Sequence, residues 1–152
     1  MELKKDSIME FDALGCSAFN ASTFYAPIWN LDSGECFLAS WTVGSKKASY
    51  VESPFFCNVV ALESYGDVLI SLSQQGNETL VHSFSVPFQK ASLIANLGHV
   101  DNISQASIID NGVFWFVSGN SEGTEWILNG VDVASGKTRS HSLGDAMIVG
   151  IA

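Results

Sequence analysis

The sequence predicts an all-β protein built from antiparallel strands. Short runs rich in Val, Ile, Phe, Tyr, Trp and Ser are separated every 8–12 residues by turn residues such as Asp32-Ser-Gly34, Asp110-Asn-Gly112 and Ser135-Gly136. Helical periodicity is scarce, and only 3 prolines interrupt the runs, so most of them can pair as ladder strands. At 152 residues the chain is long enough to bury a core, and we expect one all-β domain over residues 1–152.

The same order of four runs recurs three times, at a period of about 44 residues. The expected repeat units cover about 16–51, 58–94 and 104–143. Four antiparallel strands at this period are typical of a propeller blade. The sequence therefore predicts propeller-like four-stranded units, about three blades whose ring is incomplete in one chain, with a β-sandwich as the alternative.

Each unit contributes its strands in chain order. The expected strand regions are 16–29, 36–41 and 47–51 in the first unit; 58–62, 67–72, 79–84 and 90–94 in the second; and 104–109, 112–117, 125–133 and 137–141 in the third. Residues 113–117 are apolar at consecutive positions, which indicates burial of both faces of that strand. Residues 5–9 match the last strand of a unit and 145–149 match the first, so each end of the chain adds one strand.

One hairpin motif carries a resemblance to a known class of repeats. Val131-Asp-Val-Ala-Ser-Gly-Lys137 resembles the D-x-x-[TS]-G-K turn of quinoprotein-like β-propeller repeats. Asn30-Leu-Asp-Ser-Gly-Glu35 looks similar, although it falls at the preceding hairpin of its unit. The WD40 dipeptides and the paired glycines of kelch repeats are absent. The resemblance implies a propeller fold and no particular activity.

The charge balance excludes two classes of partner. Seven Lys and Arg against 16 Asp and Glu give a formal net charge of −9, which argues against binding nucleic acid or an anionic membrane surface. No apolar run approaches the roughly 18–20 residues that span a bilayer.

The charged residues also occupy equivalent positions in the successive repeat units. Every basic residue lies at or beside the start of the fourth strand of a unit, and we assign a partner-binding basic face to Lys46, Lys47, Lys90, Lys137 and Arg139. The turns between second and third strands, and the connections between units, carry Asp32, Glu35, Glu78, Glu122, Glu125, Glu10, Asp12, Glu52, Asp101 and Asp145. Because strands alternate in direction, these acids should share the opposite face. We expect a non-enzymatic scaffold that presents this acidic loop face to a protein partner.

Self-association is equally permitted, because the acidic face of one copy could meet the basic face of another. Open sheet edges also need to be covered, so a homo-oligomer is favoured over a monomer.

Candidate chemistry is sparse. His82, His99 and His141 are isolated in sequence, and neither a nucleophile elbow nor a glycine-rich phosphate loop occurs. We therefore assign no catalytic residue, metal or cofactor, and lean against an enzyme. The alternative function is a lectin-like, carbohydrate-binding module, in which Trp29 and Trp126 stack on sugar rings beside Asp32, Glu35, Glu122 and Glu125. A third possibility is an enzyme fragment whose active site needs further blades.

Three cysteines, Cys16, Cys36 and Cys57, lack the spacing of a metal site, and we expect them to be reduced and to pack as small apolar residues. The N-terminal residues contain no apolar region typical of a secretory signal. An intracellular, cytoplasmic location is therefore expected.

Overall fold

The computed structural model describes residues 11–13 and 16–145. Thirteen strands in this part of the chain form three antiparallel sheets, which confirms the all-β prediction and the four-stranded sheets. The strands expected at 5–9 and 145–149 fall, apart from Asp145, outside the described residues.

Sheet A contains the first five strands. They are β1 (Phe11–Ala13), β2 (Ala18–Asn20), β3 (Thr23–Asn30), β4 (Cys36–Thr42) and β5 (Ser49–Glu52). β1 and β2 both pair with β3, β1 along residues 28–30 and β2 along residues 23–25, so they lie one after the other on the same edge. A short 3-10 helix, η1 (Pro54–Asn58), leads out of this sheet, and the Ser53 hydroxyl caps it by accepting from the Phe55 amide at 3.3 Å.

Sheets B and C are simple meanders of four strands. Sheet B contains β6 (Val59–Tyr65), β7 (Val68–Gln75), β8 (Glu78–Phe84) and β9 (Ser92–Asn96). Sheet C contains β10 (Ile103–Asp110), β11 (Val113–Gly119), β12 (Trp126–Asp132) and β13 (Thr138–Gly144).

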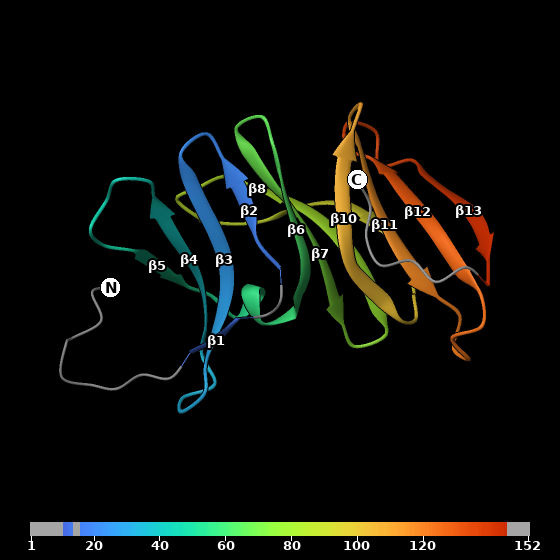
Figure 1. Ribbon diagram of the computed structural model, residues 1–152, viewed down its shortest axis with the longest axis horizontal. Helices are drawn as coiled ribbons and strands as arrows, with labels where there is room; N and C mark the ends of the chain where they lie inside the picture. Colours follow the sequence, from blue (N-terminus) through green and yellow to red (C-terminus); the bar gives the residue numbers. More distant parts are fainter. Residues whose placement is uncertain (1–10, 14–15, 146–152) are drawn as a thin grey trace.

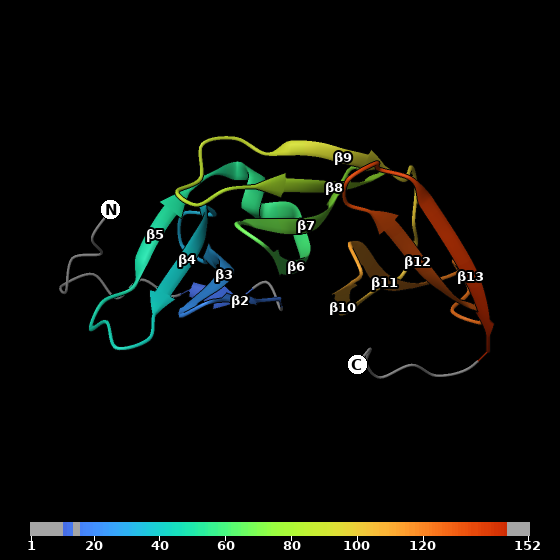
Figure 2. The same ribbon diagram turned by 90° about the horizontal axis from the view of Figure 1, so that it is seen from above.

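The three sheets stand side by side in an open arc (Figures 1 and 2). β2, β6 and β10 lie on the inner side of the arc, and β5, β9 and β13 lie on the outer side, as Figure 2 shows. The described sheets do not close a ring, so a complete propeller is not observed. Because neighbouring sheets pack face to face, the sandwich alternative is compatible with the structure.

Two apolar cores fill the spaces between the sheets. Between sheets A and B, Leu38 of β4 packs with Leu69 and Phe84 and with Phe56 of η1. Between sheets B and C the buried residues are Ala61, Ile70, Leu72, Val81, Ala95, Phe114, Phe116 and Val131. Sheet B is thus covered on both faces, and neighbouring residues Leu69 and Ile70 enter opposite cores.

The expected burial of 113–117 holds for four of its five residues. Val113, Phe114, Phe116 and Val117 are buried, whereas Trp115 is partly exposed. The Trp115 ring lies on the face of sheet C turned away from sheet B, where the Arg139 guanidinium stands 5.5 Å from the ring centroid.

The hairpin motif reflects local hydrogen bonding. In the β12–β13 turn the Asp132 amide donates to the Lys137 carbonyl at 2.8 Å, and Asp132 Oδ1 accepts from the Ser135 amide and hydroxyl. The β3–β4 turn has the same backbone bond, from the Asn30 amide to the Glu35 carbonyl at 2.9 Å. Such Asx turns suit any tight hairpin, so the motif reports a turn and not a family of repeats.

The expectation of three reduced cysteines is wrong. Cys36 of β4 and Cys57 of η1 form a disulfide that ties sheet A to the segment entering sheet B. Cys16 remains a free thiol, and burial raises its pKa to about 12, with the Glu63 carboxylate adding to the rise. Cysteine spacing alone could not reveal the pair, because the two cysteines are 21 positions apart in sequence and are brought together only by the β4–β5 hairpin.

Candidate functional site

The acidic candidates gather at one end of the three sheets. This end, called here the acidic end, lies at the bottom of Figure 1. It contains the β3–β4, β7–β8 and β11–β12 hairpins and the segments that connect one sheet to the next. Its carboxylates are Asp32, Glu35, Glu52, Glu78, Asp101, Glu122, Glu125 and Asp145. Seven are exposed and Asp101 is partly so. Glu10 lies outside the described residues, and the side chain of Asp12 is not described.

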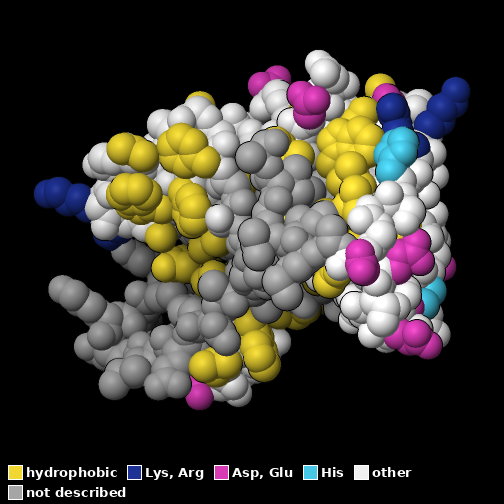
Figure 3. Space-filling view, turned by 45° about the vertical axis from the view of Figure 1, so that its right-hand side comes forward, with side chains coloured by type: hydrophobic (Ala, Val, Ile, Leu, Met, Phe, Trp, Pro, Cys, Tyr) yellow, Lys and Arg dark blue, Asp and Glu magenta, His cyan; other side chains and the backbone are white. Residues whose placement is uncertain are grey.

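The bases of the described chain lie at the other end, called here the basic end. Lys46 and Lys47 belong to the β4–β5 connection, and Lys90 precedes β9. Lys137 directly precedes β13, and Arg139 is the second residue of that strand. Three acids, Asp67, Asp110 and Asp132, share this end. In Figure 3, accordingly, Lys and Arg side chains occupy only the upper half of the visible face, whereas Asp and Glu also reach its lower edge.

The β3–β4 hairpin shows how the acids are presented. Buried Asn30 holds the turn, because its Oδ1 accepts from the Asp32 and Ser33 amides at 2.9 and 3.1 Å. Glu35 accepts a 3.1 Å bond from the Ser33 hydroxyl, and the Asp32 carboxylate has no hydrogen-bond partner among the described residues. Trp29, 39% exposed, lies beside this turn. The turn thus carries a carboxylate without a described partner, and the exposed Trp29 indole lies near its Gly34.

The β11–β12 hairpin repeats this design. Asn120 Oδ1 accepts from the Thr124 and Glu125 amides at 2.8 and 3.3 Å. Glu125 is engaged by the Ser142 hydroxyl at 2.8 Å, whereas exposed Glu122 has no hydrogen-bond partner in the described chain. Trp126 is half-buried against Gly119.

The two tryptophan candidates do not form one site. Trp29 belongs to sheet A and Trp126 to sheet C, and sheet B lies between these sheets (Figure 1). Each hairpin therefore offers at most one indole with its neighbouring acids. Trp29 is the better exposed of the two.

Sequence reasoning missed an exposed aromatic row on sheet A. Phe19, Phe24 and Trp41 are register partners on adjacent strands, and they are 55%, 41% and 43% exposed. The Trp41 indole N–H donates to the Ser45 carbonyl at 3.0 Å, which fixes the ring. Figure 3 shows hydrophobic side chains gathered on the sheet A side of the molecule. Alternation along β3 could have indicated this face, because Tyr25 and Pro27 point to the opposite one.

One titratable group lies where the inner strands meet. Glu63 of β6 is half-buried, and its Oε1 accepts from the Ser107 hydroxyl of β10 at 2.6 Å. Burial raises the pKa of Glu63, and the Ser107 bond opposes that rise. Burial also lowers the pKa of His82, whose ring contacts Phe55 edge-on.

Neither a cluster of metal ligands nor a membrane-spanning helix occurs in the described part of the chain. Nowhere in residues 11–13 and 16–145 do three His, Cys, Asp or Glu side chains gather closely enough to hold a metal ion. The described part of the chain contains no helix that is long and apolar enough to cross a bilayer.

Comparison with known proteins finds a likeness in structure but none in sequence. No family model matches the chain, and no curated protein matches it. Among solved structures, a bifunctional GH43-CE protein of Bacteroides eggerthii is similar over 84% of this chain, with a TM-score of 0.53 and 11% identity. This chain spans only 19% of the length of that structure. At such low identity the likeness concerns the fold alone.

These findings overturn the resemblance to quinoprotein-like propeller repeats. Neither sequence comparison supports that family, and the structural likeness points to a different protein. The motif that carried the resemblance is an Asx turn, and the same turn occurs at the β12–β13 hairpin and at the β3–β4 hairpin. Because these hairpins join different strands of their sheets, the motif does not identify a repeat family.

Proposed function

We propose that the chain is a non-enzymatic interaction scaffold whose acidic end docks a basic segment of a partner protein. The observation that supports this proposal is the segregation of charge. Eight described carboxylates share the acidic end, and all five described Lys and Arg side chains lie at the other. Turns place charges in solvent, but turn formation alone does not sort their sign.

A surface that carries charges of one sign affects how fast an oppositely charged partner associates with the protein and how that partner is oriented. Carboxylates without a hydrogen-bond partner in the described chain, such as Asp32 and Glu122, are available to contact a ligand. A field of one sign raises the association rate of a basic segment, and salt screens the effect. We therefore expect salt-sensitive binding with an orientation set by the acidic end.

A fluorescent octalysine peptide is a suitable probe. The paired change Asp32→Asn and Glu122→Gln removes two free carboxylates from the acidic end without removing a described hydrogen bond. The matched control Asp67→Asn and Asp110→Asn makes the same change of net charge at the basic end. At roughly 0.5 kcal/mol per exposed pair, the first variant should bind about 5-fold more weakly at low salt.

The control should lose less than about 2-fold under the same conditions, because Asp67 and Asp110 are distant from the docked peptide. Equal losses in the two variants would mean that the peptide senses only net charge. That result would refute docking at the acidic end.

Carbohydrate binding is a second candidate, favoured by one observation. Trp29 is exposed, and its indole lies near Gly34 in the turn that carries Asp32 and Glu35, so this hairpin offers a stacking surface and hydrogen-bond acceptors for a sugar. Titration with a panel of soluble oligosaccharides tests it. Trp29→Ala should abolish saturable binding, whereas Trp41→Ala, an exposed indole at the other end of sheet A, should not. Loss in both variants, or binding by neither wild type nor variants, contradicts this candidate.

A further inference from the structure

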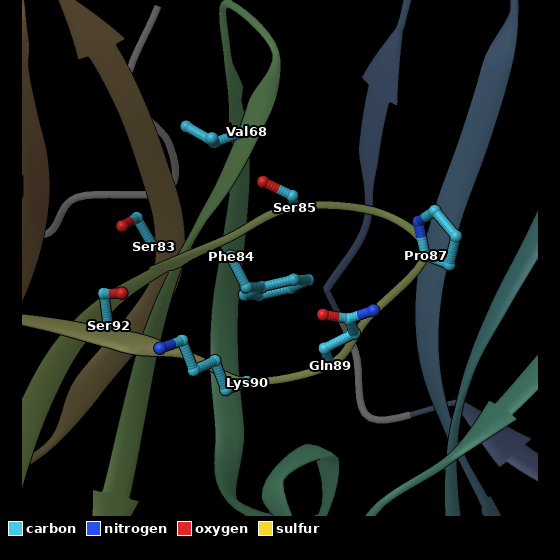
Figure 4. Close-up of a pocket in the computed structure, with 8 residues that line it drawn as sticks. All are labelled: Val68, Ser83, Phe84, Ser85, Pro87, Gln89, Lys90 and Ser92. Atoms are coloured by element: carbon cyan, nitrogen blue, oxygen red, sulfur yellow. The ribbon is translucent and has the colours of Figure 1, made fainter.

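A cavity of about 230 Å³ opens beside the connection between β8 and β9 (Figure 4). It lies at the basic end, away from the acidic hairpins. Its lining residues are Val68, Ser83, Phe84, Ser85, Pro87, Gln89, Lys90 and Ser92. Because this volume is below that of a drug-sized site, the cavity suits only a small ligand.

One wall of the cavity carries hydrogen-bond donors. Ser83 of β8 and Ser92 of β9 are register partners, so their hydroxyls project from the same face of adjacent strands. Lys90 precedes Ser92 by two residues, and Figure 4 shows its ammonium group extended toward Ser92. None of these three side chains has a hydrogen-bond partner among the described residues.

Part of the cavity lining is apolar. Val68 and Pro87 supply aliphatic surface. Phe84 also borders the cavity, but it is only 3% exposed and its ring packs in the core between sheets A and B. A ligand that fills the cavity therefore meets hydrogen-bond donors and a smaller aliphatic surface.

The charge of the lining is unusual for this chain. Among the described residues, Lys90 is the one charged residue that lines the cavity, and no carboxylate does, although the chain carries a net charge of −9. An ammonium group with two hydroxyl donors is suited to an oxyanion, because charge-assisted hydrogen bonds to its oxygens are the stronger kind.

We propose that this cavity binds a small phosphate or sulfate ester. The oxyanion contacts Lys90, Ser83 and Ser92, and the organic group of the ester lies against the aliphatic side chains of Val68 and Pro87. This site lies apart from the acidic end, and it adds the binding of a small molecule to the proposed scaffold function.

The test is an NMR titration of the labelled chain with phenyl phosphate and phenyl sulfate, with inorganic phosphate and phenol as the separate halves of the ligand. Either ester should saturate, with a Kd on the order of 1 mM, and perturb amides of residues 83–92. The tighter ester identifies the preferred anion. Inorganic phosphate should bind more weakly, because it leaves Val68 and Pro87 uncovered, and phenol should not saturate.

Lys90→Gln should weaken ester binding by about tenfold or more, since it removes the charge. Ser83→Ala and Ser92→Ala should each weaken it by a smaller factor. Lys46→Gln is the matched control, because it removes an exposed lysine from the same end of the molecule but outside the cavity. These side chains are exposed or half-buried, so a thermal melt should confirm that each variant folds. Absence of saturation for both esters, perturbations elsewhere, or equal losses for Lys46→Gln and Lys90→Gln would overturn the proposal.

Discussion

The Ser107 hydroxyl of β10 donates a 2.6 Å hydrogen bond to the Glu63 carboxylate of β6, joining the inner strands of sheets C and B. The carboxylate is half-buried between these strands, and desolvation raises its pKa above the ordinary value of 4.5 despite the Ser107 bond. Ionisation of Glu63 is therefore less favourable in the folded chain than in the unfolded chain.

This relationship predicts a pH dependence of stability. Protonated Glu63 contributes fully to the unfolding free energy below its pKa in the unfolded chain, which is near 4.5. This contribution is lost as pH rises through the higher pKa that Glu63 has in the folded chain. Glu63→Gln keeps an acceptor for Ser107 but cannot ionise. The unfolding free energy of Glu63→Gln relative to wild type should thus be higher at pH 7 than at pH 4, measured by urea denaturation. A difference that is constant or that falls with pH would contradict the assignment.

Gly136 in the β12–β13 turn should tolerate no side chain. Its φ is +73°, and a Cβ at this position would overlap the backbone carbonyl oxygen of Ile94. Gly136→Ala should therefore cost about 2–4 kcal/mol of unfolding free energy, from conformational strain and overpacking together. Gly123→Ala is the matched control, because Gly123 has a φ of +70° and open space around it. It should cost about 1 kcal/mol, and equal costs would exclude the Ile94 contact as the cause.

The Cys36–Cys57 disulfide predicts a definite thiol count. Alkylation of the unfolded, non-reduced chain should modify Cys16 alone, whereas all 3 cysteines should react after reduction. Mass spectrometry reads both states, and three reactive thiols before reduction would contradict the pair. Cys36→Ala with Cys57→Ala should destabilise the fold by about 2–4 kcal/mol, because the link constrains the unfolded chain. A disulfide also favours an oxidising compartment, so the expected cytoplasmic location needs its own test.

Self-association through opposite ends is a separate prediction. If the acidic end of one copy contacts the basic end of another, Lys46→Glu with Lys137→Glu should shift the chain toward monomer at low salt. Sedimentation velocity at about 20 mM and 500 mM salt measures the effect. A wild-type chain that is monomeric under both conditions would rule out the contact.

Much of the fold was predictable from residues alone. Turn residues such as Gly34, Gly112 and Gly136, which adopt positive φ, marked hairpins correctly, and apolar runs such as 113–117 marked strands. The family resemblance failed because it rested on turn chemistry that hairpins share. The disulfide was missed because pairing of Cys36 with Cys57 depends on tertiary position.

The candidate site was predictable only in part. Strand alternation placed the charges of Asp32, Glu122 and Lys90 at the ends where they are found. Trp29 and Trp126 are separated because sheet B lies between the sheets that contain them. The cavity beside Lys90 forms because of the path that the β8–β9 connection takes after Phe84. Neither follows from local sequence pattern.

The most direct test of the acidic end is a residue-resolved map of where a basic ligand docks. A ¹⁵N NMR titration with octalysine should perturb amides of the β3–β4, β7–β8 and β11–β12 hairpins and leave those of the β2–β3, β6–β7 and β10–β11 hairpins unchanged. Perturbations that fade at high salt would agree with electrostatic docking. Perturbations centred on Asp67 and Asp110, or spread evenly over both ends, would contradict it.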